Sequence, residues 1–125
     1  MTGPSDLFLS HSSADAAAAR ELRVVLEAAG YVCWLAPDDV VGTDPWAQQI
    51  LAAIDGCKAM LVLVSGHANA STHVSREVSL ASGRGRAVIP IRIEDVVPRG
   101  SLEYHLEGLQ RVDVFPPRSP PIATS

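Results

Sequence analysis

Apolar runs alternate with amphipathic segments along this chain, a pattern that predicts strands followed by helices. The most uniformly apolar run is AMLVLVS, at residues 59–65, and it should form a central strand covered on both faces. The other predicted strands span residues 6–10, 31–35, 87–91 and 109–114. Short connections between alternating elements predict a parallel sheet with right-handed crossovers. We therefore expect an α/β fold with five parallel strands and helices on both faces.

The first helix should begin near residue 13, because Ser12 and Asp15 have the spacing of a capping box. Gly30 is suitably placed to end this helix in the left-handed conformation. Apolar residues at helical spacing predict one stripe that packs on the sheet. That stripe consists of Ala18, Leu22, Val25, Leu26 and Ala29.

Three further helices are predicted, near residues 45–55, 72–82 and 101–107. The second helix of the chain should start with Asp44 as its N-cap and Pro45 in its first turn. Between the central strand and the helix at 72–82, the residues GHANAS are expected to be a polar loop. The expected inward-facing residues are Trp46, Ile50, Ala53 and Ile54 on one helix and Val74, Val78 and Ala81 on the next.

Length and composition favour a single globular domain, because 125 residues can bury one hydrophobic core and 47% of them are hydrophobic. Residues 1–115 should form that domain, and the Pro-rich and Ser-rich residues 116–125 should be a tail or a linker. The net charge of -4 argues against a nucleic-acid partner. Four arginines near the fourth strand fit either a solvated rim or a contact surface for an anionic ligand or partner. They are Arg84, Arg86, Arg92 and Arg99.

Two features of the chain predict a cytoplasmic protein. Cys33 and Cys57 lie on different elements without metal-ligand spacing, which suits buried thiols in a reducing compartment. No apolar stretch has the length of a membrane span, and the N-terminus lacks the pattern of a signal peptide. We therefore expect no membrane association.

Glu77 is the candidate for chemistry, because it is the only carboxylate between Asp55 and Glu94. It lies on the helix that follows the most apolar strand, and ligands bind at the carboxyl ends of the strands in open parallel sheets. His73, four residues earlier, should share its helix face. On composition alone, Glu77 is better explained as a surface acid that pairs with His73 or Arg84, because exposed acids on helices are common.

Four segments, in order and with suitable spacing, carry a resemblance to a known family. They are DLFLSHSSAD at the start, WLAPDDVVGTDPW in the middle, LVLVS with a following Ser71, Val74 and Glu77, and VIPI at the fourth strand. Together they make residues 5–115 resemble the TIR domain family. The loop at residues 38–42 reads DDVVG, where animal receptors have Arg-Asp-x-x-Pro-Gly, so the chain looks like a bacterial member.

The resemblance implies a flavodoxin-like three-layer sandwich and one of two functions. Some TIR domains hydrolyse or cyclise NAD+ and release nicotinamide, and an enzyme of this kind here would be expected to serve bacterial antiphage defence. Others bind further TIR domains without catalysis. In the enzymes a glutamate on this helix is essential, and by its position in the motif that residue is Glu77. The bond to nicotinamide breaks through an oxocarbenium-like state, which one fixed carboxylate can stabilise.

The resemblance also marks residues expected to bind substrate, and each has a structural alternative. Phe8, Ser10 and His11 would form a wall for the nicotinamide end, or else pack the core and cap a helix. Asp38, Asp39 and Gly42 would lie in a loop over the pocket that touches a neighbouring protomer, or be ordinary loop residues. Ser71 would border the ribose or cap its helix, and Trp46 would stack on a ligand ring or pack under its own helix. His73 stands where many active relatives have tryptophan.

Several classes of site are not expected. No Gly-rich loop follows the first strand, so NAD+ would be a substrate and no cofactor is predicted. No metal is predicted either, because His11, His67 and His105 are scattered. A response regulator would need an acid at the end of the third strand, where this chain has Ser65. Two hypotheses remain: an NAD+-cleaving enzyme whose site is completed by a second protomer, and a non-enzymatic module that binds other TIR domains.

Overall fold

The computed structural model describes residues 6–36, 39 and 45–115, and in this part of the chain the predicted strands form one parallel sheet. The sheet has five strands in the order β2-β1-β3-β4-β5. The strands are β1 (Leu7–Ser10), β2 (Cys33–Trp34), β3 (Ala59–Val64), β4 (Ala87–Arg92) and β5 (Val112–Asp113). The helices are α1 (Ala16–Ala28), α2 (Trp46–Gly56), α3 (Gly66–Asn69), α4 (Thr72–Gly83) and α5 (Ser101–Leu106), with a 3-10 turn at Ser13–Asp15.

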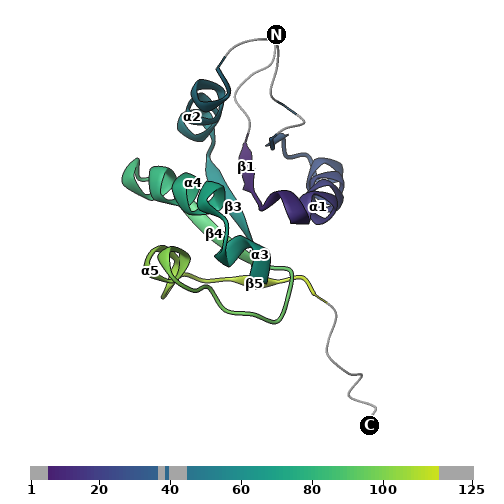
Figure 1. The fold of residues 1–125 in the computed structure, drawn as a ribbon. Coiled ribbons are helices and arrows are strands. Elements are labelled where there is room, and N and C mark those ends of the chain that lie inside the picture. Colours follow the sequence, from purple (N-terminus) through teal and green to yellow (C-terminus); the bar gives the residue numbers. More distant parts are fainter. Residues whose placement is uncertain (1–5, 37–38, 40–44, 116–125) are drawn as a thin grey trace.

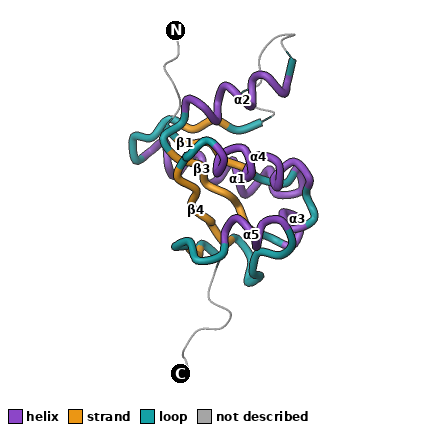
Figure 2. The backbone as a smooth tube through the Cα atoms, turned by 90° about the vertical axis from the view of Figure 1, so that its left-hand side faces the viewer, coloured by secondary structure: helices purple, strands orange, loops and turns teal. Residues whose placement is uncertain are grey.

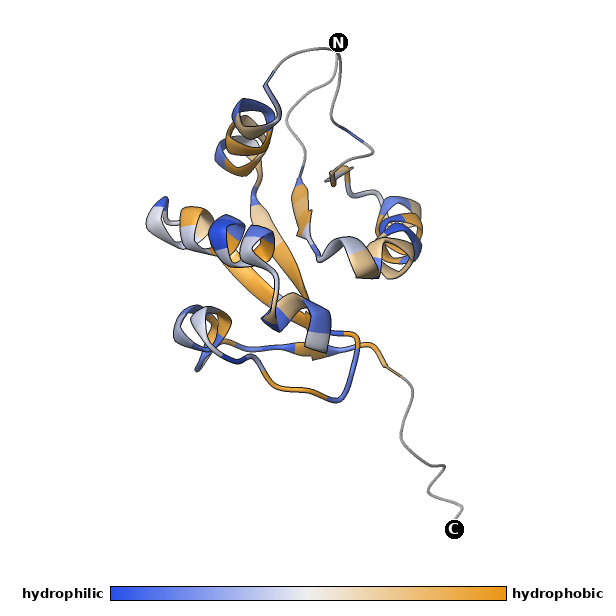
Figure 3. Ribbon diagram, viewed as in Figure 1, coloured by the Kyte–Doolittle hydropathy of each residue, from blue (hydrophilic) through white to orange (hydrophobic). Residues whose placement is uncertain are grey.

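Helices cover both faces of the sheet, as predicted for a flavodoxin-like sandwich. In Figure 1 α1 lies on one side of the strands and α2, α4 and α5 lie on the other, and Figure 2 shows the same elements after a quarter turn. The central strands are the most apolar part of the ribbon in Figure 3. The topology and the three layers predicted from the sequence are therefore confirmed.

Alternate residues of the central strands contribute to two separate cores. Phe8, Met60 and Val62 face the helices α2 to α5, where they pack with Ile54, Val78 and other residues. Residues of opposite parity face α1, and this second core includes Leu7, Leu9, Leu61 and Ile91. The period of two is that of a strand, and both of its faces are buried here. The sheet thus fixes the ends of β1 and β3 firmly relative to α4.

The edges of the sheet and one helix face differ from expectation. The strands predicted at residues 31–35 and 109–114 pair over only two residues each, because an edge strand has a single neighbour to determine its length. Val25 and Ala29 were expected to face the sheet, but both are exposed, and Val25 has 65% of its surface accessible. The expected loop GHANAS contains the short helix α3, whose first turn is capped by the side chain of Ser65.

The helix ends follow the capping residues, with one reassignment. The hydroxyl of Ser12 accepts from the amide of Ala14, as predicted, but Asp15 does not complete a capping box. Its carboxylate instead accepts a hydrogen bond of 2.5 Å from the hydroxyl of Ser65, which links the loops after β1 and β3. Gly30 has a φ of 100°, the left-handed conformation expected there. Helix α2 begins at Trp46, and Asp44 lies outside the described residues.

Most of the arginines near β4 bind acids or carbonyls of the same chain. Arg92 is 7% exposed and donates to both carboxylate oxygens of Asp113 on β5, at 2.8 and 3.0 Å. Arg84 pairs with Asp55 at the end of α2. These contacts tie neighbouring elements together, so these two side chains do not form an anion-binding surface.

Both Cys33 and Cys57 are buried free thiols, and burial raises the pKa of Cys33 to about 11.

Helix α4 depends on its cap at Ser71. The side chain of Ser71 accepts from the amide of Val74 at 3.2 Å. We predict that Ser71→Ala lowers the free energy of unfolding by about 1 kcal/mol, the usual effect of losing an N-cap. Urea denaturation measures this change. Ser82→Ala, at an exposed position of the same helix, should change stability by less than about 0.5 kcal/mol. Equal effects of the two substitutions would contradict the role of the cap.

Candidate functional site

Glu77 lies on α4 with its carboxylate turned toward the end of β1. The hydroxyl of Ser10, the last residue of β1, donates a hydrogen bond of 2.7 Å to Oε1 of Glu77. Ser10 is fully buried and Glu77 is partly buried. Glu77 is therefore not a solvent-facing acid, and the expected pairing with His73 or Arg84 is absent: Arg84 binds Asp55, and neither residue contributes to the pKa of Glu77.

Burial controls the protonation of Glu77. Removal of the carboxylate from water raises its pKa from 4.5 to about 7, and the hydrogen bond from Ser10 opposes this rise without cancelling it. A carboxyl that titrates near neutral pH, placed beside a cavity, is the kind of group that active sites tune. The site therefore holds a carboxyl that gains and loses its proton near neutral pH.

A cavity of about 380 Å³ lies between α2 and α4, beside Glu77. Its volume is at the lower end of the range for small-molecule sites. Its walls are mostly apolar, with an imidazole, a guanidinium and a carboxylate among them. The lining residues are Trp46, Ala47, Ile50, His73, Arg76, Glu77 and Leu80.

The structure brings together four of the residues predicted from the sequence. Trp46 and His73 line the cavity with Glu77, and Ser10 donates a hydrogen bond to Glu77 from the end of β1. Trp46 is 53% exposed, so it does not pack under its helix as the structural alternative required. His73 and Glu77 share a helix face, as their spacing predicted.

The other predicted residues lie elsewhere or outside the described chain. Phe8 is 1% exposed and stacks on Trp34 with ring centroids 5.2 Å apart, so it belongs to the core. His11 directs its two ring nitrogens at the carbonyl oxygens of Ser12 and Ala36, at 2.7 and 3.0 Å. Ser71 caps α4 and does not line the cavity. Asp38 and Gly42 lie outside the described residues.

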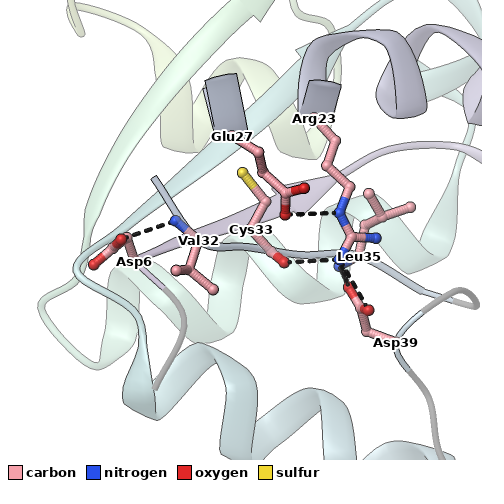
Figure 4. Close-up of polar contacts among 7 residues, drawn as sticks. All are labelled: Asp6, Arg23, Glu27, Val32, Cys33, Leu35 and Asp39. Atoms are coloured by element: carbon pink, nitrogen blue, oxygen red, sulfur yellow. Dashed lines mark hydrogen bonds and ion pairs between the residues drawn. The ribbon is translucent and has the colours of Figure 1, made fainter. Parts of the chain in front are cut away.

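Arg23, on α1, binds Asp39 beyond the end of β2. Its guanidinium pairs with Asp39 at 2.9 Å, with Glu27 at 3.1 Å, and donates to the carbonyl of Cys33 (Figure 4). Asp39 also accepts from the amide of Leu35 at 3.0 Å. Asp39 thus has a structural role, as an anchor between α1 and the end of β2.

Four residues of the cavity were missed by the sequence interpretation. Arg76 and Leu80 lie three and seven residues after His73, so a helical projection of α4 from His73 and Glu77 could have found them. Ala47 and Ile50 come from α2, and only the packing of α2 against α4 brings them to the site. Ile50 lies four residues after Trp46, so a projection from Trp46 along α2 points to it, but no sequence signal pointed to Ala47.

Comparison with known proteins identifies the family. The sequence profile of the TIR domain matches residues 7–122. The chain belongs to the TIR domain family. No protein of curated function matches it. The profile match covers almost the whole chain, so the resemblance carried by the four sequence segments is confirmed at the level of the family.

Solved TIR domains share the fold at low sequence identity. The TIR domain of a Toll-related receptor from Hydra magnipapillata superposes with a TM-score of 0.77 at 18% identity, over 87% of this chain and 83% of that one. The TIR domains of the activated Roq1 resistosome give 0.67 at 18% identity, over 82% and 68% of the chains. A TIR-STING receptor from C. gigas gives 0.73 at 21% identity, over 92% of this chain and 37% of that one.

Metal-ligand clusters and membrane-spanning helices are both absent from the described part of this TIR domain. Within residues 6–36, 39 and 45–115, no three His, Cys, Asp or Glu side chains gather closely enough to hold a metal ion. In the same part of the chain, none of the helices has both the length and the apolar character that crossing a membrane requires.

The raised pKa of Glu77 predicts a pH-dependent cost in stability. The folded chain binds this proton more tightly than the unfolded chain, so stability decreases as the pH rises from about 4.5 to about 7 and stays lower above that. We predict that Glu77→Gln raises the free energy of unfolding by about 1–3 kcal/mol at pH 8 and by almost nothing near pH 4.5.

Denaturant unfolding at both pH values measures this difference. Glu21→Gln provides the control, because Glu21 is exposed on α1 and should give no such pH-dependent difference. A Glu77→Gln chain that is no more stable than the parent at pH 8 would show that the carboxylate is well solvated.

Proposed function

We propose that this TIR domain cleaves the bond between nicotinamide and ribose in NAD+, as a glycohydrolase or cyclase, with Glu77 as the catalytic carboxylate. The observation that carries this proposal is the position of Glu77, which is partly buried, hydrogen-bonded to Ser10 and part of the wall of a cavity. An acid that served only the surface of α4 would gain nothing from this burial, which lowers stability at neutral pH.

The geometry suits a reaction in which positive charge moves onto the ribose. Oε1 of Glu77 accepts from Ser10, and we assign the second oxygen, Oε2, to the sugar. As the glycosidic bond breaks, its electron pair leaves with nicotinamide, which departs neutral and needs no general acid. The carboxylate stabilises the cation left on the ribose, and it does so more strongly because it is shielded from water. Water then adds to give ADP-ribose and a proton, or an internal nucleophile adds to give a cyclic product.

A fold neighbour supports glycosidic chemistry on this framework. A 2-desoxiribosyltransferase from Leishmania mexicana superposes with a TM-score of 0.57 at 13% identity, over 73% of this chain and 66% of that one. Its name describes transfer of a deoxyribosyl group, a reaction at the same type of sugar carbon. The same sheet and helices can therefore present groups to a glycosidic bond.

We further propose that assembly of TIR domains completes the site and that the chain acts in bacterial antiphage defence within the cytoplasm. Trp46 at the rim of the cavity is half exposed, which leaves an apolar ring for a second protomer to cover. The related Roq1 structure is described as an activated resistosome, which is an assembly. NAD+ would be bound as substrate, and neither a cofactor nor a metal is proposed.

A second candidate function is a non-enzymatic module that binds other TIR domains. Exposed apolar side chains between the middle of α1 and β2 favour it, because large apolar groups on a surface mark contact sites. These residues are Val24, Val25, Tyr31 and Val32, with exposures between 49% and 68%. This function predicts association that is indifferent to substitution of Glu77, with no nicotinamide formed even in assemblies.

Chromatography of NAD+ products separates the two functions. We predict nicotinamide release by the full chain at high concentration or with a crowding agent, and a loss of about 100-fold or more in Glu77→Gln, the usual effect of removing a preorganised charge-stabilising group. Glu21→Gln, which changes an exposed acid on another helix, should retain the parent rate. If Glu77→Gln stays as active as the parent, the assignment of the catalytic carboxylate is wrong.

A further inference from the structure

Arg76 lines the same cavity as Glu77 but makes no ion pair or hydrogen bond with any residue in the described part of the chain. Arg23, Arg84 and Arg92, by contrast, all pair with acids. The carboxylate of Glu77 takes its hydrogen bond from Ser10, and Arg76 does not contribute to its pKa. None of the described residues therefore occupies the guanidinium.

A second, shallower hollow adjoins the cavity and shares two of its walls. It measures about 410 Å³ and is lined by hydroxyl groups of α4 and the start of α5, together with Arg76 and Leu80. Successive residues of a helix point about 100° apart, so Glu77 can lie in the cavity while Arg76 lies between the two hollows. Its hydroxyl-bearing residues are Thr72, Ser75, Ser79 and Ser101.

The charges along this surface match the order of charges in a dinucleotide. Across both linings, Glu77 is the carboxylate and Arg76 is the guanidinium. In NAD+ the pyridinium ring is positive, and the diphosphate that follows the first ribose is negative. A guanidinium binds phosphate oxygens with two parallel hydrogen bonds, which a Lys side chain cannot reproduce.

We propose that Arg76 binds the diphosphate of the substrate, with the hydroxyl-lined hollow beside it receiving the chain of the dinucleotide beyond the first ribose. This inference rests on the proposed function for the reaction at Glu77, and it adds the group that selects a dinucleotide over a nucleoside. Arg76 thus contributes to substrate binding, while Glu77 acts on the bond that breaks.

Turnover of substrates with and without phosphate tests this inference. NAD+ carries the diphosphate, nicotinamide mononucleotide carries one phosphate and nicotinamide riboside carries none. For Arg76→Gln in the full chain, kcat/KM should decrease about 10- to 100-fold with NAD+, the usual effect of losing a charge-assisted hydrogen bond. With nicotinamide riboside it should change less than about twofold, and the mononucleotide should lie between. Arg76→Lys should keep part of the activity on NAD+.

Arg99→Gln is the matched control, because Arg99 is exposed, its side chain has no partner among the described residues and it lines neither hollow. It should retain parent activity with every substrate. Equal losses with NAD+ and nicotinamide riboside in Arg76→Gln, or no loss with either, would overturn the assignment of Arg76.

Binding of ADP-ribose distinguishes failure of this inference from failure of the proposed function. ADP-ribose keeps the diphosphate but has no bond to cleave, so calorimetric titration detects the contact without catalysis. Weaker binding to Arg76→Gln than to the parent and to Arg99→Gln supports the diphosphate contact, even if no substrate yields nicotinamide. If the parent does not bind ADP-ribose, or if Arg76→Gln binds it as tightly as the parent, the inference is wrong.

Discussion

The hydrogen bond from Ser10 to Glu77 joins two residues that lie 67 positions apart, and the site depends on it. Ser10 ends β1 inside the sheet, where β3 lies beside it, and Glu77 sits on the helix that packs over both strands. The contact turns the acid inward, where loss of water raises its pKa to about 7. The same rigid sheet therefore sets the direction of the carboxylate, its protonation and its place in the wall of the cavity.

Much of the fold was predictable because its central elements have unambiguous hydrophobic patterns. β3 is apolar throughout and buried on both faces, and the chain alternates strands with helices around it. The predictions that the structure corrects concern the two edge strands and one face of α1. β2 and β5 are shorter than their apolar runs, since pairing with one neighbour limits an edge strand. Val25 belongs to an apolar stripe but is exposed, because a helix that packs on a sheet buries only one part of its surface.

The site residues that the sequence predicted lie on α4, at the end of β1 and at the start of α2. Glu77 and His73 were placed on a common face of α4 by their spacing, and both line the cavity. Ala47 and Ile50 reach the same cavity from α2, which depends on tertiary packing that no local pattern encodes. Arg76 was missed for another reason. Its helical position could be projected, but its place between two hollows, without a described acid as partner, is visible only in the structure.

The carboxyl of Glu77 is shielded from water by its position between α4 and β1. NMR titration of the side-chain carboxyl carbons measures this directly, with exposed acids such as Glu21 as internal references. We expect Glu77 to titrate near pH 7, and Ser10→Ala to move its midpoint higher, because the hydrogen bond that favours the charged form is gone. A midpoint for Glu77 near the usual glutamate value, about 4.3, unaffected by Ser10→Ala, would show that the carboxylate is solvated.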